Sequence, residues 1–239
     1  MSIVWMLVIT CVVLQLSVFA TTIFLHRTLT HRGLRLHPVV SNLMHLHIKL
    51  FTGIQPRQWA AVHRKHHHFS DKEGDPHSPH LEGLWTVLFG NAFMYRKEAR
   101  NPATVNKYTP DYKEDWVDKI PFGAYGCFVG WALFILAFGW AWGSGLFVWQ
   151  GITYILLNSA INSVCHMVGY KNYNNTATNV QWIAVITGGE GLHNNHHEFP
   201  SSARMSMTAR EFDPAWPLIW LMVKFGWAEL NQASLAKAA

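Results

Sequence analysis

Nine histidines fall into four groups whose spacing is typical of metal binding. In chain order the groups are His26 and His31; His63, His66 and His67; His166, four residues after Asn162; and His193, His196 and His197. Imidazole is a ligand for Fe, Zn, Cu and Ni, so the residue type does not name the ion. In an HxxHH group, positions i, i+3 and i+4 share one helix face and can present three rings together. The pattern predicts a metal site.

The first pair poses a geometric question. His26 and His31 are five residues apart, which on a regular α-helix separates two side chains by about 140°. Either the helix ends between them, or the two rings serve different metal ions.

The remaining six histidines are expected to have ordinary roles. His37, His45 and His47 are interpreted as polar core or interfacial residues, and His68, His77 and His80 as surface residues or residues behind the ligands. A loop that merely scavenges metal would not explain two HxxHH groups far apart in the chain, each beside an apolar stretch.

Two long uncharged stretches must position these groups. Residues 3–25 carry no charge and are long enough to cross a hydrocarbon core of roughly 30 Å. No Lys or Arg precedes Arg27, which disfavours a cleaved signal peptide. The stretch between Lys119 and Lys171 suits two further spans, at about 120–142 and 145–167, with a turn at residues 142–145, where glycine supplies backbone freedom.

Charge placement orients these three spans. All Lys and Arg residues lie in segments on one side, which the positive-inside rule makes cytoplasmic. The N-terminus is then external, and residues 26–119 and 168–239 form a cytoplasmic cap. Within the cap, His37–Trp59 and Pro214–Leu230 are expected to be interfacial amphipathic helices. We predict one all-α domain over residues 1–239, an integral membrane helical bundle whose helical cap holds a dimetal site.

Composition narrows the class of protein. Half of the 239 residues are hydrophobic and only 14% are charged, against roughly 25% in an ordinary soluble domain. A soluble enzyme and a nucleic-acid-binding protein are both disfavoured. The three cysteines lie far apart in apolar stretches, so no disulfide framework is expected. The net charge of +5 is explained by the predicted membrane topology and does not by itself indicate an anionic ligand.

The three histidine boxes, in this order and beside spans, resemble those of the membrane fatty-acid desaturases. The nearest likeness is to the acyl-CoA Δ9 (stearoyl-CoA) desaturases and their bacterial acyl-lipid relatives. It covers roughly residues 20–205 and includes further matching elements: Trp59, Asp75-Pro76-His77, Asn162-Ser163, Gly189-Glu190-Gly191 and Phe199-Pro200.

This resemblance implies a diiron centre held by the nine histidines, with Asn162 near one iron through water. Members of the family use O2 and two electrons from a separate donor to remove two hydrogens from neighbouring carbons of a long acyl chain lying in a tunnel. Attack on an unactivated C–H bond requires redox iron rather than zinc. The expected product is a cis double bond, at Δ9, in a chain carried by CoA, acyl carrier protein or a glycerolipid.

Position in the family pattern suggests roles for other residues. Basic residues that contact the phosphates of the acyl carrier in the family are matched by Arg64, Arg96 and Lys97. An equally good explanation is that these charges only reflect membrane topology under the positive-inside rule. Glu190 is expected to orient a histidine ring.

The sequence departs from the family pattern twice. One span rather than two precedes the first box, so a partner subunit could complete the tunnel wall and a homo-oligomer is possible. There is no fused cytochrome b5 domain, since Val39-Val40 rather than two glycines follows His37-Pro38. We therefore expect an external ferredoxin- or cytochrome-type donor, and a bacterial inner membrane as the location.

Rival functions are a related diiron hydroxylase or acetylenase, an intramembrane zinc protease and a metal transporter. The protease is disfavoured because no HExxH occurs. The transporter is disfavoured because no carboxylate lies within a span.

Overall fold

The computed structural model describes residues 1–121, 123–232 and 234. Their helices are α1 (Ile3–Ala20), η1 (Thr21–Thr30), α2 (Pro38–Phe51), α3 (Pro56–Phe69), α4 (Pro79–Glu82), α5 (Leu84–Ala99), α6 (Pro102–Tyr108), η2 (Gly123–Gly126), α7 (Cys127–Phe138), α8 (Trp140–Met167), α9 (Gln181–Ile186), α10 (His193–Glu198) and α11 (Ala215–Lys224). Two short strands, β1 (Leu34–Leu36) and β2 (Ala228–Leu230), pair antiparallel with Leu34 opposite Leu230. The predicted helical architecture is therefore largely confirmed, with this small sheet as an addition.

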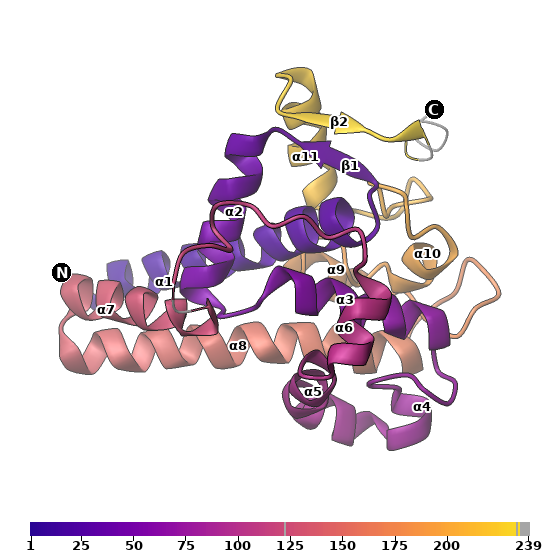
Figure 1. The fold of residues 1–239 in the computed structure, drawn as a ribbon, viewed down its shortest axis with the longest axis horizontal. Helices are drawn as coiled ribbons and strands as arrows, with labels where there is room; N and C mark the ends of the chain where they lie inside the picture. The colour runs from indigo at the N-terminus through magenta and orange to yellow at the C-terminus, as the bar shows by residue number, and fades with distance from the viewer. Residues whose placement is uncertain (122, 233, 235–239) are drawn as a thin grey trace.

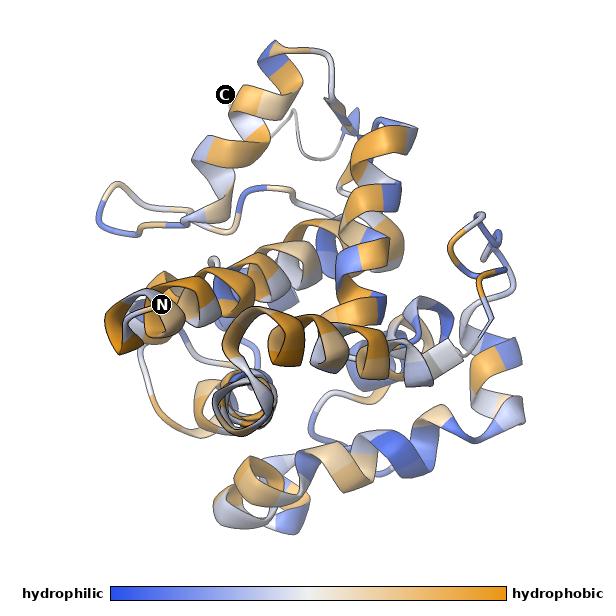
Figure 2. Ribbon diagram, turned by 90° about the vertical axis from the view of Figure 1, so that its left-hand side faces the viewer, coloured by the Kyte–Doolittle hydropathy of each residue, from blue (hydrophilic) through white to orange (hydrophobic). Residues whose placement is uncertain are grey.

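The helices α1–η1, α7 and α8 form an elongated bundle. The continuous helix α1–η1 lies along α8, and α7 folds back on α8 as a hairpin (Figure 1). Their outward side chains are large and apolar, and they include Trp5, Leu136, Trp140 and Ile152. Figure 2 shows α1 and α7 as strongly hydrophobic helices, whereas α8, seen end-on, has mixed colours. Among the described residues, one helix, Ile3–Thr30, is long and apolar enough to cross a membrane.

The turn between the two later spans was predicted at the wrong place. The chain reverses at Gly139, whose φ of 80° favours glycine, and α8 already begins at Trp140. Gly143 lies inside α8 and serves a different purpose, because a Cβ there would meet the carbonyl oxygen of Phe134 at 2.5 Å. The absence of a side chain at Gly143 allows α7 and α8 to approach closely. Because α8 begins at Trp140, it is 28 residues long.

The two predicted interfacial helices are also corrected. The first is two helices, α2 and α3, since Pro56 begins a new helix after a break at 52–55. In α2 the polar His45 and Lys49 are buried while Leu43 is exposed, because Lys49 Nζ donates to the carbonyl oxygens of Val117 and Ile120. The second helix, α11, ends at Lys224, and the chain continues into β2.

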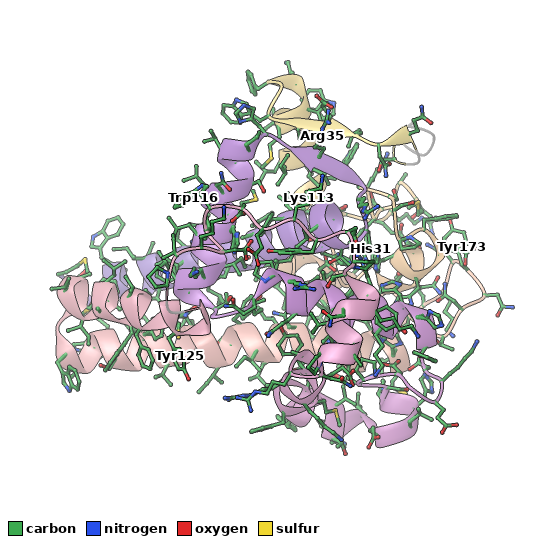
Figure 3. The ribbon with its side chains drawn as sticks, in the orientation of Figure 1. His31, Arg35, Lys113, Trp116, Tyr125 and Tyr173 are labelled. Carbon is green, nitrogen blue, oxygen red and sulfur yellow. The ribbon has the colours of Figure 1, made fainter. Side chains whose placement is uncertain are left out.

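The helix η1 is the centre of the core. Ile23 and Leu25 are fully buried and pack with Ile48 of α2 and Ile219 of α11. Figure 3 places His31, at the end of η1, in the interior, whereas Arg35 and Tyr173 lie at the periphery. The first histidine box is thus held on the most enclosed helix of the fold.

Candidate metal centre

A π-helix answers the question of the first box. Residues Thr21–Thr30 form η1 with bonds from residue i to i−5, including the N–H of His31 to the carbonyl oxygen of His26 at 3.0 Å. The hydroxyls of Thr28 and Thr30 also donate to carbonyl oxygens five residues back, at 2.7 Å each. Residues five apart therefore lie on one face, and the rings of His26 and His31 are 4.8 Å apart, centroid to centroid.

Each HxxHH group is divided between two clusters rather than presented as one set of three rings. On α3, His63 and His67 face one cluster and His66 faces the other; on α10, His196 faces the first and His193 and His197 the second. The two helices meet at the centre, where the rings of His67 and His197 stack at 4.4 Å. The helical spacing, which allows three rings to be presented together, does not by itself determine this division.

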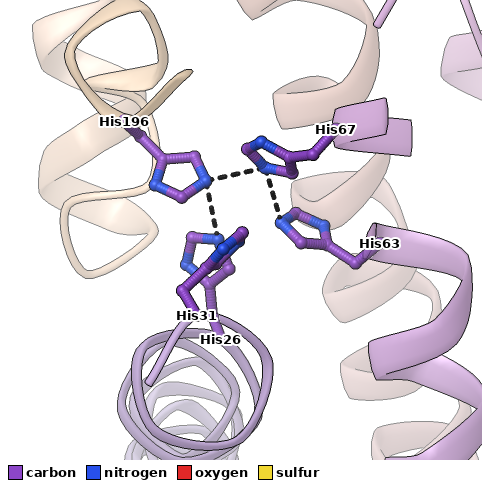
Figure 4. Close-up of side chains that lie close together, drawn as sticks. All are labelled: His26, His31, His63, His67 and His196. Atoms are coloured by element: carbon purple, nitrogen blue, oxygen red, sulfur yellow. Dashed lines mark hydrogen bonds between the residues drawn. The ribbon is translucent and has the colours of Figure 1, made fainter. Parts of the chain in front are cut away.

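The five-histidine cluster consists of His26, His31, His63, His67 and His196 (Figure 4). Its Nε2 atoms converge. The distance from His196 Nε2 is 3.0 Å to that of His26 and 2.9 Å to that of His67, and His63 and His67 are 3.1 Å apart at the same atoms.

The four-histidine cluster consists of His66, His166, His193 and His197. The Nε2 atoms of His193 and His197 lie 3.1 Å apart. The Nε2 atoms of His66 and His166 are buried and have no hydrogen-bond partner among the described residues. A buried unpaired nitrogen is costly, and it points to a ligand of the cluster.

Carboxylates hold three of the rings from behind. Nδ1 of His26 lies 2.8 Å from Glu190 Oε1, Nδ1 of His66 lies 3.0 Å from Asp75, and Nδ1 of His166 lies 2.7 Å from Asp71. An ionised carboxylate only accepts, so each ring donates its proton from Nδ1 and leaves the Nε2 lone pair free. The predicted role of Glu190 is confirmed in this geometry, and the hydroxyl of Thr22 also donates to the same oxygen.

Electrostatics keeps the clusters in the form that binds cations. Burial, reinforced by neighbouring histidines, holds the pKa of His31, His63 and His196 well below the usual value. Burial raises the pKa of Asp75, but the hydrogen bond from His66, together with further electrostatic interactions with His66 and His77, outweighs burial, and the pKa is lowered to about 2. Near neutral pH these three rings are thus neutral, and the carboxylate of Asp75 is charged.

The residues present fit a pair of metal ions. Two imidazole nitrogens at right angles on one ion, each about 2.1 Å from it, would be about 3 Å apart, which matches the Nε2 separations of 2.9–3.1 Å. Nitrogen-only donor sets of this kind suit Fe and its neighbours rather than Mg or Ca.

The other predicted site residues lie in different surroundings. Asn162 is half-buried one turn before His166, and its side chain makes no hydrogen bond with the described residues. Arg64 uses all five N–H donors within the chain: on the carbonyl oxygens of Leu29, Thr30 and Tyr108 and twice on Asp111. Arg96 and Lys97 are exposed at the end of α5.

Sequence reasoning left several residues around the site without a role. Asp71 and Asp75 were not assigned to His166 and His66, although a run of acids directly after the second box was a signal. Arg27 is buried and pairs with Asp213 at 2.9 Å, and it also donates to the carbonyl oxygens of Gly188 and Ala203, so it ties the first box to the chain around the third.

The six other histidines stand outside both clusters. His37 caps α2, and His45 lies 2.7 Å from Asp115. His47 Nε2 lies 2.9 Å from the Ser17 hydroxyl, and His68 is exposed. His80 is half-exposed and donates to the carbonyl oxygen of His166. His77 is buried with its ring 4.8 Å from that of His66, so it lies behind a ligand and not at the surface.

Comparison with known proteins agrees with this geometry. A family model described as "Fatty acid desaturase" matches residues 3–220. The Delta-9 desaturase-like 2 protein of Arabidopsis thaliana is 31% identical over 221 residues, which are 85% of this chain and 69% of that protein. The Delta-9 acyl-lipid desaturase 2 of the same plant is 32% identical, with 83% and 65% covered.

A third relative, the Acyl-CoA C20 Delta5-desaturase of Anemone leveillei, is 32% identical over 89% of this chain and 69% of its own length. The matched part of the chain thus spans about two thirds of these relatives. The family inferred from the histidine boxes is confirmed. The chain belongs to the fatty acid desaturase family and is an oxidoreductase that desaturates fatty acyl chains.

Proposed function

We propose that the protein is an O2-dependent membrane desaturase that introduces a cis double bond, at Δ9, into a long saturated acyl chain. The observation that carries this proposal is the convergence of nine histidines in two adjoining clusters, with carboxylates behind three of the rings. In this proposal each cluster holds one iron, and Asn162 approaches the four-histidine cluster through water.

Two irons would supply the oxidising power needed to remove hydrogen from an unactivated methylene. The chain's own residues have three tasks. The carboxylates of Glu190, Asp71 and Asp75 fix ring orientation and tautomer. The buried walls around the clusters exclude water, which would otherwise consume a reactive oxidant. The helices η1, α3, α8 and α10, with His31 directly after η1, hold the rings in place.

A small crevice beside the clusters has room for about one water molecule. It lies between the α1–η1 helix and α8 and is lined by Val18, Thr21, Leu157, Asn158, Ile161, Thr187 and Glu190. Glu190 also contacts His26, so this crevice reaches the back of a cluster ring. We propose that it is part of the acyl slot. Each buried methylene would contribute about 0.8 kcal/mol, so long chains should bind better than short ones.

The remaining features of the proposal concern partners and topology. We propose three spans with an external N-terminus and a cytoplasmic cap in a bacterial inner membrane. Electrons come from a ferredoxin- or cytochrome-type donor, and a homo-oligomer could complete the tunnel. Arg96 and Lys97, being exposed, remain candidates for contact with carrier phosphates.

The decisive experiment is expression in a host that lacks unsaturated fatty acids, followed by gas chromatography and mass spectrometry of its lipids. Named relatives include both Delta-9 and Delta5 enzymes, so derivatisation must fix the position of the double bond. His66→Ala is the inactive control, and His45→Ala is the matched histidine control outside both clusters. A hydroxylated or acetylenic product without alkene would reject the desaturase assignment in favour of a related diiron hydroxylase or acetylenase. Metal uptake without lipid product would favour transport.

A further inference from the structure

Helix α5 carries an aromatic stripe on its exposed face. Trp85, Phe89 and Phe93 are 67%, 66% and 78% exposed, and they follow one another at intervals of four residues, so they lie on one face. The rings of Trp85 and Phe89 stack at 6.0 Å. The opposite face is buried at Val87 and Asn91. Three large aromatic rings on one open face are rare unless that face meets an apolar phase or a partner.

The position of α5 indicates what covers the stripe. α5 packs against α8. α8 exposes Ile152 and Ile155 to its surroundings, so the apolar outer surface of the bundle continues along the helix that α5 contacts. Figure 2 looks along α8 and shows α5 running across the view. If α8 crosses the membrane, α5 lies parallel to the membrane plane, at the surface of the bilayer.

The charges at the end of the stripe complete the pattern. Arg96, Lys97 and Arg100 are exposed, and no ion pair involves them among the described residues. The acid between them, Glu98, turns inward to Lys65 at 2.8 Å. A helix with aromatic residues on one face and a basic end is suited to the boundary between lipid and water, where cations meet headgroup phosphates.

We propose that α5 is a membrane-surface helix that inserts Trp85, Phe89 and Phe93 among the lipids and places its basic end in the headgroup layer of an anionic phospholipid surface. The segment was expected to be part of the cytoplasmic cap. In this proposal α5 also anchors the second histidine box close to the bilayer, because residues 70–83 join α3 to α5 and the two helices contact each other. This proposal rests on the proposed span of α8.

Spin labels test the proposal in the full chain reconstituted in vesicles that contain an anionic phospholipid. A label at Phe89→Cys is compared with Ile152→Cys on the outer face of α8 and with Lys107→Cys on exposed α6, in a background where Cys11 and Cys127 are replaced by Ser. The third native cysteine, Cys165, is fully buried and stays. We expect the Phe89 label to collide with O2 several-fold more often than with a water-soluble nickel chelate, at a depth between the two references.

Three outcomes would overturn the proposal, and they differ. A Phe89 label that behaves like the Lys107 label while the Ile152 label is in lipid rejects α5 alone. If the Ile152 label is also in water, the proposed span of α8 fails together with it. A Phe89 label that is immobile and shielded from both colliders means that protein, such as a second copy, covers the stripe.

Lipid charge provides an independent arm. A Phe93→Cys label lies one turn from Arg96 and should be deeper in vesicles with anionic phospholipid than in purely zwitterionic vesicles, because the basic end is drawn to the surface. Equal depth in both would reject the headgroup contact.

Discussion

The five-histidine cluster and the four-histidine cluster are built from one residue type but are held in different ways. In the first, several Nε2 atoms lie about 3 Å from one another and a single carboxylate, Glu190, supports one ring. In the second, two of the four rings are each fixed by their own aspartate. In the five-histidine cluster the rings are positioned mainly by contact with one another. In the four-histidine cluster, aspartates behind the rings fix their orientation.

This difference indicates where each cluster is vulnerable. A cluster with five donors can lose one and retain a tetradentate set, whereas a cluster with four falls to three. Metal binding by the four-histidine cluster should therefore be more sensitive both to loss of a ring and to loss of the carboxylate that orients a ring.

The largest expected effect is that of His66→Ala. It removes one of only four donors and leaves the buried Asp75 without its main partner, so activity should fall to background. Iron should fall from about two to about one ion per chain, measured by elemental analysis of purified protein. His45→Ala is the control and should keep most of both. Full turnover by His66→Ala would disprove the ligand assignment.

The supporting carboxylates should rank next. Loss of a group that orients a ligand typically costs 10–100-fold in metal affinity or activity. Asp75 also accepts from the backbone N–H groups of Asp71 and His77, so Asp75→Asn should lie near the upper end and Glu190→Gln near the lower end. Competition with a chelator measures affinity at each cluster. The reverse order would show that metal binding by the five-histidine cluster is the more sensitive of the two.

A third change separates two roles of Arg64. Arg64→Met removes hydrogen bonds to the carbonyl oxygens of Leu29 and Thr30, which end η1 and hold His31. We expect a loss of about 1.5–3 kcal/mol in stability, measured by thermal denaturation in detergent, with weaker metal binding only in the five-histidine cluster. A raised KM for the acyl carrier with unchanged melting would instead support the phosphate role.

The smallest effect concerns a histidine outside both clusters. Burial lowers the pKa of His47 to about 4, so the folded chain keeps this ring neutral while the unfolded chain binds a proton below about 6.5. Stability should therefore fall as the pH drops from 7 to 5. His47→Gln should reduce that fall by about 1–2 kcal/mol, seen as a smaller shift in melting temperature, with iron content unchanged. An identical pH response in both proteins would contradict the assignment.

The sequence was sufficient to predict the helical class and the nine candidate ligands, because histidines at helical spacing beside apolar stretches carry strong local signals. The family followed from the resemblance of the three histidine boxes to those of known desaturases. It did not predict how the rings divide between the clusters. His63 and His66 lie three residues apart on α3 yet face different clusters, and that depends on how α3 and α10 cross. Gly143 was read as a turn because glycine serves turns and close helix contacts alike, and only packing distinguishes the two.

The π-helix of η1 has a consequence for how the first box can vary. A regular α-helix brings residues four apart to one face, and the wider η1 does the same for residues five apart. Deleting one residue between His26 and His31 could therefore be absorbed by a change of helix type, with the two rings still adjacent. Motif searches for this fold should accept both spacings, and a designer who shortens the box should expect the groups behind it, such as Arg27, to need a new register.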